Sequence, residues 1–309
     1  MERRTFLSTA AIAAVTAPVL RAAQPDAPLP NTAGLIDTNV YASSWPVRHS
    51  WAETPAILAE KLRRHGVVSA WVGSFEGVLH SDIAGVNARL TAACARDGAG
   101  RLQPFGTINP TLPDWEDDLR RCAEVHRMPG VRLHPNYHGY TLDDARFVRL
   151  IDLAAQRGLL VQIALVLEDD RSQNPALAAP PVQAAPLADV VQNFPTARVM
   201  LLNSAPRVLG GNTPLLARLV AAGVRFEIAT LEGVAGIQSV LQKMPDIRLC
   251  FGSHAPYFYF EAALLKLQES ALTADQLAAI RFGNARAALK AGRASARSLL
   301  EQPVPDKAG

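Results

Sequence analysis

The chain of 309 residues contains only three cysteines, and no two of them form a C-x-x-C pair. This excludes a disulfide scaffold and gives no sign of a structural zinc site. An excess of either charge is also missing, because 31 basic residues stand against 28 acidic ones and the formal charge is +3. We therefore expect neither nucleic acid nor a membrane surface as a partner.

The sequence also lacks a long hydrophobic run and the glycine-rich motifs of nucleotide-binding folds. The apolar segment near the N-terminus is too short to span a membrane. Neither G-x-G-x-x-G nor G-x-x-x-x-G-K occurs, so no dinucleotide or P-loop site is indicated. Apolar residues, in contrast, make up 49% of the chain and charged residues 19%, which is typical of a folded globular protein and excludes intrinsic disorder.

Residues 1–25 predict an export signal. Arg3 and Arg4 precede Phe6 and Leu7, and a mildly apolar run of Ala, Val and Ile follows. This order resembles a twin-arginine signal, which directs folded proteins to the periplasm. The alternative is a chance arginine pair before a helix. We expect a periplasmic protein and leave these residues out of the fold.

After this segment, short apolar runs rich in β-branched residues alternate with helical patterns. The runs lie at 34–41, 67–74, 101–108, 130–135, 159–166, 197–204, 224–230 and 247–254, and helices are expected at 54–65, 83–96, 114–126, 143–157, 187–194, 213–222, 232–243 and 258–270, with a closing helix at 273–291. Eight strand–helix units predict an α/β fold, a (β/α)8 TIM barrel over residues 30–291. The tail at 292–309 is expected to be loosely attached.

Polar residues gather at the predicted carboxyl ends of the strands, where active sites of such barrels lie. A single strand-end residue of this kind typically caps a helix or bonds a loop. Together they predict a small-molecule site. The segment 174–186 contains four prolines and follows the fifth strand. It is either a passive surface loop or a rim or lid of the site. The candidate residues are Asp37, Asn39, Tyr41, Arg132, His134, Gln162, Glu168, Arg171, Asn203 and His254.

Several of these residues lie in runs that resemble the amidohydrolase-related family, in the branch of the aminocarboxymuconate-semialdehyde decarboxylases and related TIM-barrel hydrolases. The runs are Ile36-Asp37, 105–110 (FGTINP), 130–135 (GVRLHP), 251–256 (FGSHAP) and 283–286 (GNAR). Their order and spacing match over residues 34–290. The resemblance implies a TIM barrel that hydrolyses or decarboxylates a small molecule.

The metal ligands that the resemblance implies are replaced in this chain. Family members open with Ile-Asp-x-His-x-His, whose histidines bind a divalent metal, and here these positions hold Asn39 and Tyr41. The later ligand positions fall on Ala164, Asn203 and His254. Alanine cannot bind a metal, and amides are weak zinc ligands. We therefore predict no metal and no other cofactor, with a rebuilt site around the rim histidines as the alternative.

The remaining titratable groups predict a metal-free mechanism. His134 and His254 are the expected proton-transfer groups, and Asp37 either orients an imidazole or bonds strand-end backbone. Arg132 is suited to hold a substrate carboxylate, or alternatively to pair with Asp37 or Glu227 in the barrel. Substrate contacts are assigned to Asn39, Tyr41, Arg132, Gln162, Asn203, Glu168 and Arg171.

The predicted function is an exported small-molecule hydrolase that cleaves a C–N, ester or lactone bond in a carboxylate-bearing substrate. A decarboxylase of the same family is one alternative. A non-catalytic barrel that binds a small ligand is the other, because every usual metal-ligand position is changed. The sequence does not indicate the oligomeric state.

Overall fold

The computed structural model describes residues 34–290, except 53, 170, 172, 206 and 212. The predicted export signal at 1–25 and the predicted tail at 292–309 lie outside the described residues. Within the described part, no helix is long and apolar enough to cross a membrane.

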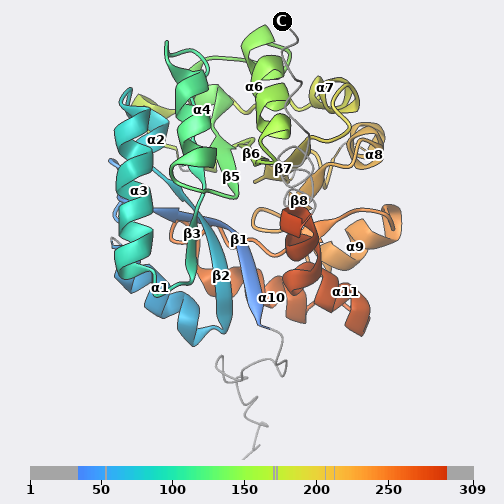
Figure 1. The fold of residues 1–309 in the computed structure, drawn as a ribbon. Helices are drawn as coiled ribbons and strands as arrows, with labels where there is room; N and C mark the ends of the chain where they lie inside the picture. Colours follow the sequence, from blue (N-terminus) through green and yellow to red (C-terminus); the bar gives the residue numbers. More distant parts are fainter. Residues whose placement is uncertain are drawn as a thin grey trace, which may run out of the picture. The chain divides into compact units, whose positions relative to one another are not determined.

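Parallel strands alternate with helices along the described chain (Figure 1). They pair in the order β1-β2-β3 in one sheet and β4-β5-β6-β7-β8-β9 in another. Each strand therefore pairs with its neighbour in sequence, as successive βα units require. The strands are β1 (Leu35–Ala42), β2 (Val67–Ser74), β3 (Leu102–Pro104), β4 (Gly106–Thr107), β5 (Gly130–Leu133), β6 (Leu160–Ala164), β7 (Arg198–Leu202), β8 (Arg225–Glu227) and β9 (Leu249–Cys250).

The third predicted strand, 101–108, is divided into β3 and β4. Pro104 ends β3, and proline has no N–H to donate to the ladder. The next residue, Phe105, donates its N–H to the carbonyl of Val72 on β2 at 2.8 Å. This bond keeps the two pieces in line, so β3 and β4 together form the third strand of the barrel.

The last strand, β9, is shorter than the predicted run 247–254, because the chain leaves the regular ladder before His254. His254 has a φ of +56°, in the left-handed region. Backbone bonds nevertheless join this segment to β1: Thr38 donates to the carbonyl of Phe251 at 2.9 Å, and His254 donates to that of Asn39 at 2.8 Å. These bonds close the barrel between the last strand and the first, and the (β/α)8 prediction is confirmed.

Helices follow the strands at the predicted places. Several begin at residue types that typically cap helices; Thr54, Asp82 and Asp144 each accept a backbone N–H of the first turn. The sequence did not predict the single turns α2 and α5. The helices are α1 (Pro55–Arg64), α2 (Glu76–Leu79), α3 (Ile83–Asp97), α4 (Trp115–Glu124), α5 (Pro135–His138), α6 (Ala145–Gln156), α7 (Leu187–Gln192), α8 (Thr213–Ala221), α9 (Gly236–Lys243), α10 (Phe260–Gln268) and α11 (Ala274–Ala278).

Two short segments have other helical forms. A 3-10 turn, Pro175–Leu177, lies in the proline-rich segment after β6. A π-helix, Ala279–Gly283, interrupts the predicted closing helix 273–291. The backbone N–H of Phe251 donates to the carbonyl of Ile280 at 2.9 Å, so the π-helical segment is bonded directly to the chain just after β9.

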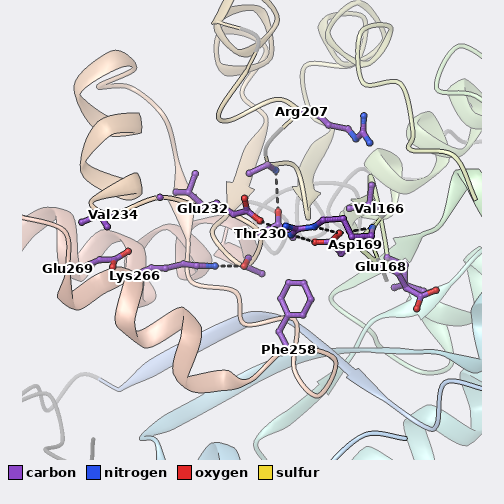
Figure 2. A pocket seen from close by; sticks show the side chains of 16 residues that line it. Val166, Glu168, Asp169, Arg207, Thr230, Glu232, Val234, Phe258, Lys266 and Glu269 are labelled. Atoms are coloured by element: carbon purple, nitrogen blue, oxygen red, sulfur yellow. Dashed lines mark hydrogen bonds and ion pairs between the residues drawn. The ribbon is translucent and has the colours of Figure 1, made fainter. Parts of the chain in front are cut away.

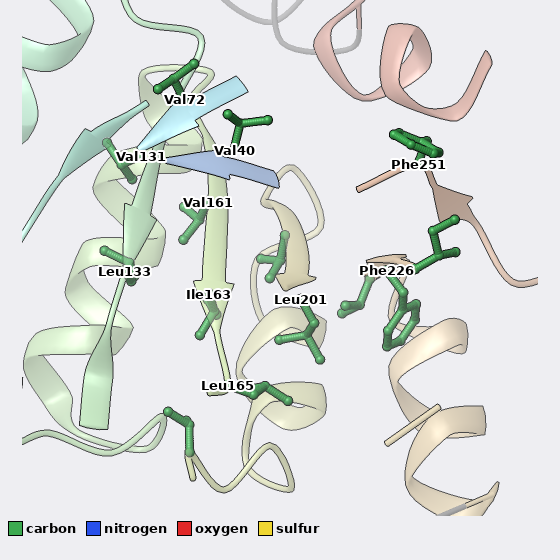
Figure 3. Close-up of a cluster of buried hydrophobic side chains, with 14 of the residues drawn as sticks. Val40, Val72, Val131, Leu133, Val161, Ile163, Leu165, Leu201, Phe226 and Phe251 are labelled. Atoms are coloured by element: carbon green, nitrogen blue, oxygen red, sulfur yellow. The ribbon is translucent and has the colours of Figure 1, made fainter. Parts of the chain in front are cut away.

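The main core lies between strands and helices (Figure 3). On β5 and β6, Val131 pairs with Val161 and Leu133 with Ile163, and all four side chains are buried in this core. Successive side chains on a strand point to opposite faces. The residues between them therefore point into the barrel, and this alternation brings polar side chains to the barrel interior.

Candidate functional site inside the barrel mouth

Arg132 of β5 lies fully buried inside the barrel. Its Nε donates to Oε1 of Gln162 at 2.9 Å, and its terminal nitrogens donate to the carbonyls of Val40 (2.6 Å), Trp71 (3.0 Å) and Thr38 (3.2 Å). The guanidinium thus links β5 to β6, β1 and β2. It forms no ion pair with a lumen carboxylate among the described residues, and the N–H groups that would hold a substrate are bonded within the barrel.

Asn39, Asn203 and Glu227 form a second buried network. Asn39 Nδ2 donates to Oδ1 of Asn203 at 2.8 Å and to Oε1 of Glu227 at 3.3 Å. Backbone N–H groups of Asn203 (2.6 Å) and Ala229 (2.5 Å) also donate to the Glu227 carboxylate. Burial raises the pKa of Glu227 above its usual value. Sequence reasoning treated Glu227 only as a partner for Arg132, although it is the one acid in the predicted strand 224–230.

Asp37 bonds to the segment after β9 and not to an imidazole. Its Oδ2 accepts from Ser253 Oγ at 2.5 Å, and its Oδ1 accepts from the backbone N–H groups of Ser253 and Asn39, both at 3.1 Å. The prediction that Asp37 orients a histidine is therefore wrong, and the alternative of a bond to strand-end backbone is confirmed. Burial raises the pKa of Asp37 to about 7, although these hydrogen bonds oppose the rise.

His134 is held by Tyr41 from across the barrel. The Tyr41 hydroxyl and His134 Nε2 are 3.0 Å apart, and the Arg132 guanidinium lies 4.5 Å from the centre of the Tyr41 ring. His134 Nδ1 is buried without a hydrogen-bond partner. Burial lowers the pKa of His134 well below its usual value, so the imidazole is neutral at pH 7.

His254 has one bonded and one unpartnered ring nitrogen. Its Nε2 lies 2.8 Å from the carbonyl oxygen of Leu167. Because a carbonyl only accepts, Nε2 carries the proton and Nδ1 keeps a lone pair. Nδ1 is buried without a partner. Burial lowers the pKa of His254 to about 4, so this imidazole is also neutral at pH 7.

The mouth of the barrel is filled by an aromatic cap, which we define as Trp45, Phe75, Tyr137, Tyr257 and Phe258. The ring of His254 lies 5.4 Å from that of Tyr257 and 5.0 Å from that of Phe258, measured between centroids. Both candidate histidines are fully buried. The open rim of polar residues expected from the sequence is thus closed by side chains from four different loops.

A pocket of about 770 Å³ opens beside the cap, at the carboxyl ends of β6, β7 and β8 (Figure 2). Of the predicted site residues, only Glu168 and Arg171 line it; the other eight lie in the barrel interior. Phe258 lines the pocket too, with its ring against His254. The lining residues are Val166, Leu167, Glu168, Asp169, Arg171, Ala205, Arg207, Ala229, Thr230, Leu231, Glu232, Gly233, Val234, Phe258, Lys266 and Glu269.

Charged groups of both signs line this pocket. Lys266 Nζ donates to the carbonyls of Ile228 (3.2 Å) and Ala229, and burial lowers the pKa of the lysine below its usual value. Arg171 pairs with Asp169 at 2.5 Å and lies 3.7 Å from Glu232. The lysine retains one N–H, because an ammonium has three. The sequence did not predict Lys266 as a site residue, because helix α10 carries no recognisable motif.

Glu168 connects the pocket to the aromatic cap. The hydroxyl of Tyr257 donates to its Oε1, while Oε2 is buried without a partner. The carboxylate thus ties the loop after β6 to the loop after β9. This contact fixes the position of Tyr257.

Two glycines make room for the charged side chains of the barrel interior. A methyl group at Gly73 on β2 would lie 2.8 Å from Cδ of Arg132, and one at Gly252 would lie 2.9 Å from Cδ of Glu227. Carbon atoms in contact stay about 3.5–4.0 Å apart. Neither position therefore accepts a side chain while its charged neighbour is in place.

The chain belongs to the amidohydrolase family, whose family model matches residues 56–291. No curated protein sequence matches the chain. Among solved structures, it is similar to 5-carboxyvanillate decarboxylase from Sphingomonas paucimobilis, with 14% identity, a TM-score of 0.62, and 83% of this chain and 99% of that chain covered. It is also similar to dihydroxybenzoic acid decarboxylase from Polaromonas sp. JS666 with bound manganese. The identity is 13% and the TM-score 0.62, with 83% of this chain and 97% of that chain covered.

A protein named as a probable hydrolase is also among the similar structures. The protein from Acinetobacter baumannii named "probable 2-pyrone-4,6-dicarboxylic acid hydrolase" has 12% identity and a TM-score of 0.56, with 83% of this chain and 99% of that chain covered. At these identities the similarity shows the fold alone. The similar structures include proteins named as decarboxylases and one named as a probable hydrolase, so they do not choose between the two reactions.

The residues at the family's metal-ligand positions do not fit a metal ion. Asn39 turns its Nδ2 donor toward Asn203 and Glu227, Ala164 has no donor atom, and the Nε2 proton of His254 points at a carbonyl. Among the described residues, no three His, Cys, Asp or Glu side chains are grouped so that they could hold an ion. Asn39 and Asn203, at two of these positions, are hydrogen-bonded to each other.

Proposed function

We propose that the chain is a hydrolase that uses its own side chains to cleave a C–N, ester or lactone bond in a small carboxylate-bearing substrate. Membership of the amidohydrolase family supports an enzyme but does not choose the reaction. The observation that carries the proposal is the neutral imidazole of His254. Its proton is fixed on Nε2 by Leu167, its Nδ1 is unpartnered, and its ring lies 5.0 Å from that of Phe258, which lines a pocket large enough for a small substrate.

In this proposal the substrate lies in the pocket and its carboxylate bonds the remaining N–H of Lys266. Phe258, which is only half-buried, turns aside and exposes Nδ1 of His254. A water molecule donates a proton to Nδ1 as its oxygen attacks the carbonyl carbon. The imidazolium then returns this proton to the leaving nitrogen or oxygen as the scissile bond breaks, so the protons balance.

The experiment is a turnover screen of the purified protein on lactones, amides and esters that carry a carboxylate, with proton release or chromatography as the readout. His254→Asn is the decisive variant, because asparagine tolerates the left-handed backbone at this position. We expect the rate to fall by about 10²–10⁴-fold, the usual contribution of a general base. His80→Asn, at an exposed histidine, is the control. Equal rates in the parent and His254→Asn would contradict the mechanism.

Two other functions are each favoured by one observation. Similar structures named as decarboxylases favour loss of CO2 from the substrate, which the same screen detects with aromatic carboxylates and a CO2 assay. The aromatic cap, which buries both candidate histidines, favours a barrel that only binds its ligand. Binding without any product across the panel would support this last function and overturn the hydrolase.

A further inference from the structure

A smaller cavity of about 130 Å³ is lined by Tyr257 and shares Phe258 with the large pocket. The loop after β1 supplies Trp45, Arg48, His49, Ser50 and Trp51 to its lining. Phe75 and the segment after β9 supply the aromatic remainder, and Phe258 lines both cavities. The mechanism proposed above uses none of the side chains from the loop after β1.

Three polar atoms of these lining residues are buried without a hydrogen-bond partner: Trp45 Nε1, Ser50 Oγ and Trp51 Nε1. Trp45 is 3% exposed. The two indole N–H groups only donate, and a serine hydroxyl also donates. A bound acceptor would satisfy these groups, which folding has removed from water.

A positive charge accompanies the donors. The Arg48 guanidinium lies 4.5 Å from the centre of the Tyr257 ring, and none of the described ion pairs of the chain involves Arg48. A cationic ligand is disfavoured because the chain already places its own cations on these rings; Lys61 Nζ lies 5.4 Å from the Trp51 ring. Donors, a guanidinium and aromatic walls together select an anion with an apolar body.

We propose that this cavity is a second binding site, for a small monocarboxylate whose apolar body is no larger than a benzene ring. Arg48 and the unpartnered donors bind the carboxylate, and the rings of Trp45, Phe75 and Tyr257 pack against the body. The volume sets this upper limit, since it lies slightly below that of an apolar cavity of about 150 Å³ that holds benzene. The site goes beyond the proposed hydrolysis and does not depend on it.

A ligand series on the unaltered protein tests the proposal by isothermal titration calorimetry, with the fluorescence of Trp45 and Trp51 as a second readout. Benzoate is expected to bind with one equivalent at this site, at least 10-fold more tightly than benzyl alcohol or benzylamine, which match its shape without its negative charge. Equal affinities for the three probes, or no heat with millimolar benzoate, would overturn the proposal. This series uses only the unaltered protein, so its result does not depend on whether a variant folds.

Variants then locate the bound benzoate. Arg48→Met is expected to weaken benzoate binding at least 10-fold, while Arg64→Met, an exposed arginine of α1, leaves it unchanged. Trp45→Phe keeps the ring, removes the N–H and weakens binding several-fold. Loss of binding in Lys266→Met but not in Arg48→Met places benzoate in the large pocket and overturns the second site. Because benzoate binding is measured without turnover, its outcome does not depend on the hydrolase screen. Failure of one proposal can thus be distinguished from failure of the other.

Discussion

Replacing Asp37 by asparagine should remove a pH-dependent loss of stability. Burial raises the pKa of Asp37 to about 7 in the folded protein, whereas an unfolded aspartate titrates near about 3.9. The folded state therefore holds this proton more tightly than the unfolded state does. Its contribution is fully present below about pH 4 and is lost as the pH rises toward and through 7.

The magnitude follows from the same two pKa values. At pH 5 the folded carboxyl is protonated, about two pH units below its pKa, and by pH 8 it has lost the proton. At 1.36 kcal/mol per unit, the parent therefore loses about 2.7 kcal/mol of stability between these pH values. Asparagine mimics the protonated form: its oxygen accepts from the backbone N–H groups of Ser253 and Asn39, and its amide faces Ser253 Oγ. Asp37→Asn should thus gain about 2 to 3 kcal/mol relative to the parent between pH 5 and pH 8.

Urea denaturation of both proteins at several pH values, followed by tryptophan fluorescence, measures this difference. Only the difference between variant and parent is used, because every other titrating group cancels in it. Asp246→Asn, at an exposed carboxylate, is the matched control for removing one acidic group. A difference for Asp37→Asn that does not change with pH would refute the assignment of a buried, protonated carboxyl at this position.

Three further outcomes are expected. Relative to His254→Asn, the parent should lose about 3 kcal/mol of stability as the pH falls from 6.5 to about 4. Burial lowers the pKa of His254 to about 4, so over this range only the unfolded imidazole gains the proton. A stability difference in urea that does not change with pH would contradict this. Chelator treatment should leave the melting temperature and turnover unchanged, whereas one equivalent of zinc or manganese lost together with activity would restore a metal mechanism. Changing Arg3 and Arg4 to lysine should abolish periplasmic accumulation, and unchanged fractionation would argue against twin-arginine export.

The fold could be predicted because hydrophobic periodicity is local. Apolar runs such as 159–166 are visible in the sequence, and eight of them alternating with helices leave few topologies. The boundaries were harder: the division of 101–108 depends on Pro104, and the early end of β9 depends on the left-handed backbone at His254. Such conformations are set by tertiary contacts with β1, which no single segment displays.

For the candidate site, the sequence predicted which residues lie inside the barrel but not which partners they bond. The alternation of side chains placed Asn39, Arg132 and Asn203 in the barrel interior, because this follows from strand geometry. Their partners could not be predicted, since hydrogen bonds across the barrel join residues far apart in the chain, as Asp37 joins Ser253. The aromatic cap was missed for the same reason: its members come from different loops, and no spacing links Trp45 to Tyr257.

The glycines at 73 and 252 carry a consequence for reading related sequences. Each accommodates one buried charge, Arg132 or Glu227, so the two members of a pair cannot vary independently during evolution. A homologue that keeps the arginine must keep glycine at the first position, and one that gains a side chain at the second must lose the glutamate. We therefore expect both pairs to be retained or lost together among homologues, which an alignment of family sequences would test without reference to any reaction.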